Sequence, residues 1–221
     1  MDQQEPAELI LDVFTDPRSV RDVSSNYGTH IAHSNYFRPG ILHTIFFHRF
    51  FPAVTPQTRE VLDLSLPYVD NDELETMIDQ RAAALERQLD AERSSANSTG
   101  GGRGQFTVQF FEKRRRKAWL TRGDDEVCWE CWTLKVTVAE PKTESGAYLF
   151  PDEMGVVHQE RAKVRRAMEQ TLQTTVMKIV TFVNTHKDHI PPITTQGVNP
   201  FPYKITVEQK ESSWANRMRM Y

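Results

Sequence analysis

The residues of this chain that are able to do chemistry begin with Cys128 and Cys131, which have a Cys-x-x-Cys spacing (CWEC). A redox pair of this spacing belongs at a helix N-terminus, where the helix dipole lowers the thiol pKa. Here the pair falls in a strand-like run, in which positions three apart point to opposite faces unless a bulge intervenes. A zinc site would need two further ligands. The pattern therefore favours a packing role for both thiols.

Histidine is the commonest metal ligand, and three pairs of histidines lie close together along the chain: His30 and His33, His43 and His48, His186 and His189. A helical zinc pair needs a spacing of four residues, so that both rings project from one face. His43 and His48 are five apart on a predicted helix and lie on different faces. His186 and His189 stand at a predicted helix end, where a cationic ring suits the dipole. None of the three pairs predicts a metal site.

Motifs for phosphate binding and nucleophilic catalysis are missing from the sequence. The run GGGRG lacks the terminal Gly-Lys-Ser/Thr of a phosphate loop and does not follow a predicted strand. There is no Gly-x-Ser-x-Gly elbow and no pair of helical carboxylates. We therefore expect no catalytic, cofactor-binding or metal-binding residues, no cofactor, and a protein that is not an enzyme.

The strongest charged feature is KRRRKAWLTRG, residues 113–123, in which Trp119 and Leu120 follow a basic run. Basic runs are typical of nucleic-acid sites. Alternation along a strand splits these charges between two faces, however, and the formal net charge of the chain is −3. We interpret the charges as keeping a protruding hairpin soluble. A tryptophan exposed at its tip is explained most simply by a protein partner, the alternative being that Trp119 folds back onto its own domain.

The composition is that of an ordinary globular domain, with 221 residues of which 38% are hydrophobic and 26% charged. The longest apolar stretch, ILHTIFFHRFF, is interrupted by histidine and arginine and is shorter than the ~20 apolar residues that span a bilayer. The beginning, MDQQEPAELI, lacks the features of a signal peptide. Two cysteines form no disulfide framework. We expect a cytosolic protein without a transmembrane segment.

Hydrophobic periodicity predicts the elements that position these residues. Residues 8–14 are predicted to form a strand. When residues 24–39 are left out, SVRDV and GILHTIFFHRFF join into one predicted amphipathic helix, which follows this strand. That segment is polar and aperiodic and ends in a proline, so we interpret it as an insertion, with a gene-model artefact as the open alternative. Residues 61–69 alternate as a strand does, and residues 73–93, preceded by an acidic capping segment, form a predicted helix.

The second half is predicted to contain a hairpin, a long helix and a last strand. A flexible linker at 94–104 leads into QFTVQFFEKRRRKAW and VCWECWTLKVTVAE, which the loop LTRGDDE joins as a hairpin. Its apolar faces comprise Phe106, Val108 and Phe110 on one strand and Trp132, Leu134, Val136 and Val138 on the other. After a loop at 141–155, a wide apolar stripe predicts a buried helix from about His158 to His186. PFPYKITVEQK is the last strand. The order predicts one α+β domain over 1–221, with a mostly antiparallel sheet packed against helices.

Five segments occur in an order that resembles one known family: HTIFFHR, FFEKRRRKAW, CWECWTLKVTV, IVTFVNTHKDHIP and PYKITV. Together they are similar to the autophagy-related protein 101 family, whose members have a single HORMA domain. The Trp-Glu-x-Trp strand after a basic, Trp-containing hairpin is the most specific of these features. The resemblance covers most of the chain except 24–39, 141–155 and the C-terminal tail.

The resemblance implies a function that the residues alone do not. Family members are non-catalytic subunits of the autophagy-initiation kinase complex, where they pair with and stabilise the HORMA domain of autophagy-related protein 13. They also recruit downstream autophagy factors through a protruding tryptophan-phenylalanine finger. Trp119 matches the finger tryptophan, whereas Leu120 stands at the phenylalanine position and lacks a flat aromatic face. The implied locations are the cytoplasm and the preautophagosomal structure.

A second class of function remains open at this point. HORMA proteins of the chromosome-axis or checkpoint type associate with nucleic acid, and the run KRRRK would then be the contact. The negative whole-chain charge favours the adaptor, for which we expect no nucleic-acid partner.

Overall fold

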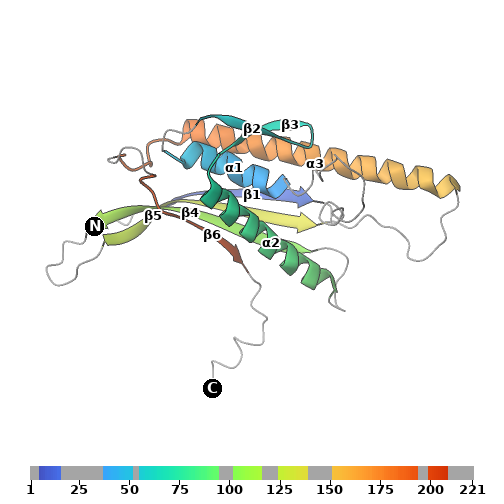
Figure 1. Cartoon of the computed structure of the whole chain (residues 1–221), viewed down its shortest axis with the longest axis horizontal. Helices are drawn as coiled ribbons and strands as arrows, with labels where there is room; N and C mark the ends of the chain where they lie inside the picture. Colours follow the sequence, from blue (N-terminus) through green and yellow to red (C-terminus); the bar gives the residue numbers. More distant parts are fainter. Residues whose placement is uncertain are drawn as a thin grey trace, which may run out of the picture.

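The structure is a computed structural model that describes residues 5–15, 37–51, 55–94, 102–115, 124–138, 151–193 and 199–208. Its elements in chain order are β1 (Ala7–Thr15), α1 (Phe37–Arg49), β2 (Gln57–Val61), β3 (Leu64–Tyr68), α2 (Asp72–Ser94), β4 (Arg103–Arg115), β5 (Asp124–Val138), α3 (Pro151–Thr185) and β6 (Tyr203–Glu208) (Figure 1). This arrangement confirms the predicted α+β class.

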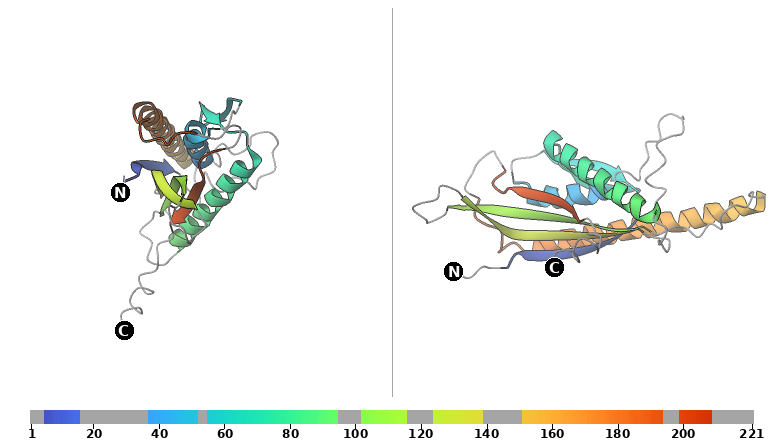
Figure 2. Two further views of the ribbon diagram at one scale, coloured as in Figure 1. Left: turned by 90° about the vertical axis from the view of Figure 1, so that its left-hand side faces the viewer. Right: turned by 90° about the horizontal axis from the view of Figure 1, so that it is seen from below.

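Four strands form the main sheet in the order β1-β5-β4-β6, and β2 and β3 form a separate two-stranded sheet. β4 pairs antiparallel with β5 and β6, whereas β1 runs parallel to β5. The helices cover one face of the main sheet, and α1 contacts both α2 and α3 (Figures 1 and 2). The sheet is therefore mostly antiparallel, as predicted, with one parallel pair at its edge.

The core lies between the sheet and these helices. Alternate residues of the two central strands point into it, and all seven predicted inward-facing residues are buried: Phe106, Val108, Phe110, Trp132, Leu134, Val136 and Val138. Phe46 of α1 packs edge-on against the ring of Phe110, with 5.4 Å between the ring centroids. The period-two pattern of the hairpin strands thus identified the core face correctly.

The predicted cap of α2 is confirmed, but the linker before β4 is shorter than predicted. Asn71 Oδ1 accepts a hydrogen bond from the backbone N–H of Leu74 at 2.9 Å, as an N-cap residue does. α2 continues to Ser94, and β4 begins at Arg103, inside the predicted linker 94–104. Gly104 lies in β4 and packs closely against α2, because a Cβ at this position would lie 2.4 Å from Cδ1 of Leu85.

The single strand predicted at 61–69 is wrong. The chain reverses at Leu62 and Asp63, so that Val61 pairs with Leu64 and two short strands form a hairpin. Both turn residues have positive φ (48° and 62°), as in the two-residue turns that match strand twist. Neither is the glycine or asparagine that usually marks such turns. Leu62 is buried, and we infer that its burial offsets the cost of the left-handed backbone.

Two helices begin earlier than predicted. α1 starts at Phe37, so the last three residues of the proposed insertion 24–39 form its first turn. Pro39 is tolerated there because the first N–H groups of a helix have no intrahelical acceptor. Residues 16–36, with His30 and His33, lie outside the described residues. α3 starts at Pro151, a residue type that suits a first helical turn. The predicted loop 141–155 is therefore shorter than expected at its C-terminal end.

Candidate functional site

The two central strands are longer than the strands beside them. β1 pairs with β5 only from Glu130 to Val138, and β6 pairs with β4 only from Gln105 to Phe110. Residues 111–115 of β4 and 124–128 of β5 therefore pair only with each other, and they extend beyond the sheet as a two-stranded ribbon, here called the arm (Figure 2). The described part of the molecule thus contains the predicted protruding hairpin.

The predicted finger residues, Trp119 and Leu120, lie outside the described residues. They belong to 116–123, the segment that connects the two strands of the arm. Their role therefore stays a prediction, and the structure supplies the strands that carry them.

Basic residues of β4 are paired with acidic residues of β5 along the arm. Lys113 is paired with Glu126, Arg114 with Asp125, and Arg115 with Asp124. Nε of Arg114 also lies 2.6 Å from a carboxylate oxygen of Glu112 on the same strand. Opposite charges across a strand pair stabilise it and reduce the net charge that the ribbon presents. Lys113 and Arg114 of the basic run therefore each have an acidic residue as their cross-strand neighbour.

A β-bulge marks the point where the sheet ends and the arm begins. The register shifts between Phe110 and Phe111, because Phe110 pairs with Glu130 and Phe111 with Cys128, which leaves Trp129 without a partner residue on β4. Trp129 is buried against the rings of Phe110, Phe201 and His189, with centroid distances of 5.8, 5.1 and 5.6 Å. The bulge thus breaks the strand alternation that the sequence predicted here.

Next to the bulge lies a buried cluster of charged side chains. Oε1 of Glu130 accepts hydrogen bonds from Nε of Arg49 at 2.7 Å and from the indole nitrogen of Trp132 at 2.6 Å. Oε2 lies 2.7 Å from Nε2 of His189, which must be the donor because a carboxylate only accepts. Glu130 is fully buried and Arg49 is 2% exposed. Sequence patterns gave no signal of this contact between α1, β5 and the segment after α3.

The bulge also corrects the expected placement of the cysteines. Cys128 and Cys131 pair with Phe111 and Gln109, two positions apart on β4, so both thiols lie on the same face of the sheet. Both are free thiols. Burial, followed by the neighbouring Cys128 and Glu8, raises the pKa of Cys131 to about 11. A thiol protonated at neutral pH is a weak nucleophile and metal ligand, which supports the packing role.

His43 and His48 lie on different sides of α1, as predicted. His43 is buried, and its ring lies tilted by 41° against the ring of Tyr68 with 4.3 Å between the centroids. Burial, and next the positive charge of Arg59, lower its pKa to about 4. His43 is therefore a neutral core residue at neutral pH, and no described group of three or more His, Cys, Asp or Glu side chains is arranged to hold a metal ion.

His43 should make the stability of the fold depend on pH. Its folded-state pKa of about 4 lies below the ordinary 6.5, so between these values the unfolded chain binds more protons. The free energy of unfolding should then fall as pH drops from 6.5 to 4, by at most about 1.4 kcal/mol per pH unit from this residue. Urea titrations of the wild type and His43→Phe would show a smaller loss for the variant across this window. Parallel curves would refute the assignment.

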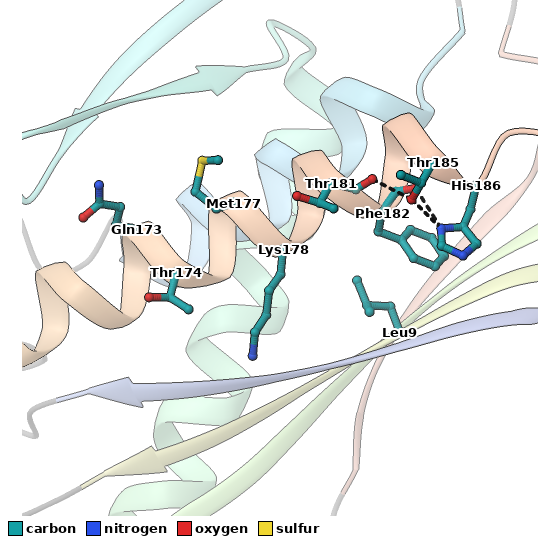
Figure 3. A pocket seen from close by; sticks show the side chains of 9 residues that line it. All are labelled: Leu9, Gln173, Thr174, Met177, Lys178, Thr181, Phe182, Thr185 and His186. Carbon is teal, nitrogen blue, oxygen red and sulfur yellow. Dashed lines mark hydrogen bonds between the residues drawn. The ribbon is translucent and has the colours of Figure 1, made fainter.

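A surface groove of about 560 Å³ lies between α3 and the edge strand β1 (Figure 3). Leu9 of β1 and Met177 and Phe182 of α3 line it with apolar atoms. At one end Oγ1 of Thr185 lies 2.8 Å from Nδ1 of His186, a contact drawn in Figure 3. The lining includes no carboxylate and no thiol. The hydroxyl of Thr185 also donates to the carbonyl oxygen of Thr181 at 2.8 Å.

These features define a class of protein: an α+β domain of the HORMA type, with a sheet covered on one face by helices and a hairpin that protrudes from it. The chain belongs to the autophagy-related protein 101 family, whose profile matches residues 32–197. The region that the family profile matches also includes residues 32–39 and 141–155, which are not part of the five family-like segments named in the sequence analysis.

Individual relatives share the name of the family. The autophagy-related protein 101 of Arabidopsis thaliana is 29% identical over 180 residues, which cover 78% of this chain and 80% of the relative. That of Schizosaccharomyces pombe is 25% identical over 179 residues, covering 81% and 82%. The human protein is 26% identical over 195 residues, covering 76% and 79%.

No helix in the described ranges is long and apolar enough to cross a membrane.

Proposed function

We propose that this chain is a non-catalytic adaptor of autophagy initiation. It pairs with and stabilises the HORMA domain of autophagy-related protein 13 within the initiating kinase complex. It recruits downstream factors through Trp119 at the end of the arm, where Leu120 adds apolar area. It acts in the cytoplasm and at the preautophagosomal structure.

The observation that carries this proposal is the arm itself. A two-stranded ribbon that leaves the sheet is held by the hydrogen bonds between its two strands, so it can project a connecting segment away from the body of the domain. Trp119 lies in that connecting segment. An aromatic side chain presented there has the size and flat apolar surface of a typical interface anchor. Family membership supports the choice of autophagy as the process.

The described chemistry is consistent with an adaptor. The thiols have raised pKa values, His43 is neutral and buried, and the groove beside β1 is lined by no carboxylate and no thiol. The buried carboxylate of Glu130 is fully engaged by its neighbours and does not line that groove.

The nucleic-acid alternative loses support from the charge pairing along the arm. A phosphate-binding stripe needs uncompensated lysines and arginines on one face. Here Lys113 and Arg114 are each paired with an acidic residue of β5, Glu126 and Asp125. We therefore keep this alternative only as an outcome of the following experiment.

Pairing with the HORMA domain of autophagy-related protein 13 should survive high salt. In about 1 M salt the Debye length is about 3 Å, so contacts that depend on long-range charge are lost. We expect the two proteins to co-purify under these conditions, both for the wild type and for a variant with Arg114, Arg115 and Arg116 replaced by glutamine. The opposite result would be that the wild type binds DNA tightly and in a salt-sensitive manner, that the variant does not bind DNA, and that neither pairs with the HORMA domain. This result would favour the nucleic-acid function over the adaptor.

A further inference from the structure

We propose that the buried cluster of Arg49, Glu130 and His189 is the positioning device of the arm: it fixes the direction in which the arm leaves the sheet. This inference deepens the proposed function, because the direction of the arm decides where the finger points. It assigns Glu130 and His189 a role beyond ordinary core packing.

The position of the cluster is the first argument. Glu130 is the first residue of β5 that pairs with β1, and its partner Phe110 is the last residue of β4 that pairs with β6. The carboxylate therefore lies at the boundary where the arm loses the support of the neighbouring strands. Arg49 ends α1, and His189 follows the end of α3. Two helices thus hold the strand at this boundary.

The need for support is the second argument. A two-stranded ribbon is marginally stable by itself and twists more than a wide sheet does. A bulge at its base bends the strand further. Beyond the boundary, among the described residues, the N–H of Phe111 also donates to the carbonyl oxygen of Pro202 at 2.8 Å. The direction of the arm must therefore be set mainly at the bulge.

The chemistry of the contacts is the third argument. Hydrogen bonds between ionised groups are shorter, stronger and more directional than neutral ones. Nε of Arg49 lies 2.7 and 2.9 Å from the two carboxylate oxygens of Glu130, out of reach of solvent. Apolar packing alone tolerates small rotations of a strand, whereas this geometry fixes the rotation of the Glu130 side chain.

His189 connects the two bulge residues. Its Nε2 donates to Glu130 at 2.7 Å, and its ring lies 5.6 Å from the ring of Trp129. The same imidazole therefore contacts the charged and the apolar member of the bulge. It is 16% exposed, so its replacement removes these contacts without opening a fully buried cavity. His189 is thus the position at which the proposal is best tested.

The test is hydrogen exchange of the full chain, comparing amides of the arm with those of the sheet. In His189→Ala we expect arm amides, residues 111–115 and 124–128, to exchange about tenfold faster, as expected for the loss of a hydrogen bond to a charged group. Sheet amides at Phe106 and Val108 should keep their rates. His189→Gln, whose amide can still donate to Glu130, should recover most of the protection. His186→Ala is the matched control, because His186 stacks on Phe182 and does not contact Glu130.

Equal acceleration in arm and sheet would show that His189 only stabilises the fold, and unchanged arm rates would show that it does not position the arm. Either result overturns the proposal. The exchange experiment needs no partner, so its outcome is independent of the finger. If His189→Ala loosens the arm as expected while Trp119→Ala leaves recruitment intact, the positioning role stands and the proposed finger function fails.

Discussion

Glu130→Gln is expected to lower the free energy of unfolding by about 3–5 kcal/mol, the typical result of removing one partner from a buried ion pair. Glutamine has nearly the shape of glutamate, so the loss comes from charge and not from a cavity. The guanidinium of Arg49 would stay buried at 2% exposure without its counter-ion. Chemical denaturation at neutral pH, followed by tryptophan fluorescence, measures the effect.

Glu169→Gln is the control for this prediction. Oε1 of Glu169 pairs with Nε of Arg165 at 2.8 Å on the exposed surface of α3, one helical turn away. Exposed pairs of this kind contribute less than about 1 kcal/mol. If both substitutions cost the same small amount, the cluster around Glu130 is not the buried, desolvated site that the structure describes.

Local patterns predicted much of this fold because they report on burial along one element. The alternation in β4 and β5 identified Phe106 and Trp132 as core residues, and the capping segment predicted before α2 contains the observed cap, Asn71. In each of these cases the residues that carry the signal are close in sequence.

The buried cluster could not be predicted, because its members are far apart in sequence. Arg49 and Glu130 are 81 residues apart, and Glu130 and His189 are 59 residues apart. A single sequence carries no signal for such contacts. The bulge at Trp129 was hidden for a related reason, since it shows only in the register between two strands. The hairpin at Leu62 and Asp63 was missed because its turn lacks glycine and asparagine.

The cluster gives a physical reason why three of the family-like segments matter to the fold. HTIFFHR supplies Arg49, CWECWTLKVTV supplies Glu130, and IVTFVNTHKDHIP supplies His189. They meet at the base of the arm that FFEKRRRKAW begins. Four of the five segments that carry the resemblance therefore converge on the arm.

Trp119→Ala is expected to weaken finger-dependent recruitment by about 2 kcal/mol, roughly thirtyfold, which is the usual cost of truncating an interface anchor. The melting temperature and pairing with the HORMA domain of autophagy-related protein 13 should not change, because the finger lies away from the core in this account. Leu120→Ala should have a smaller effect, since leucine offers apolar area without an aromatic face. Affinity capture followed by quantitative mass spectrometry measures recruitment and pairing, and thermal unfolding of the same purified variants measures the melting temperature.

Comparison of the wild type with Trp119→Ala in that capture experiment tests the adaptor function most directly. We predict that the variant retains its HORMA partner and its melting temperature and loses the downstream autophagy factors. A clear drop in melting temperature would place Trp119 in the core of its own domain. That result, or undiminished recruitment by a stable variant, would contradict the account.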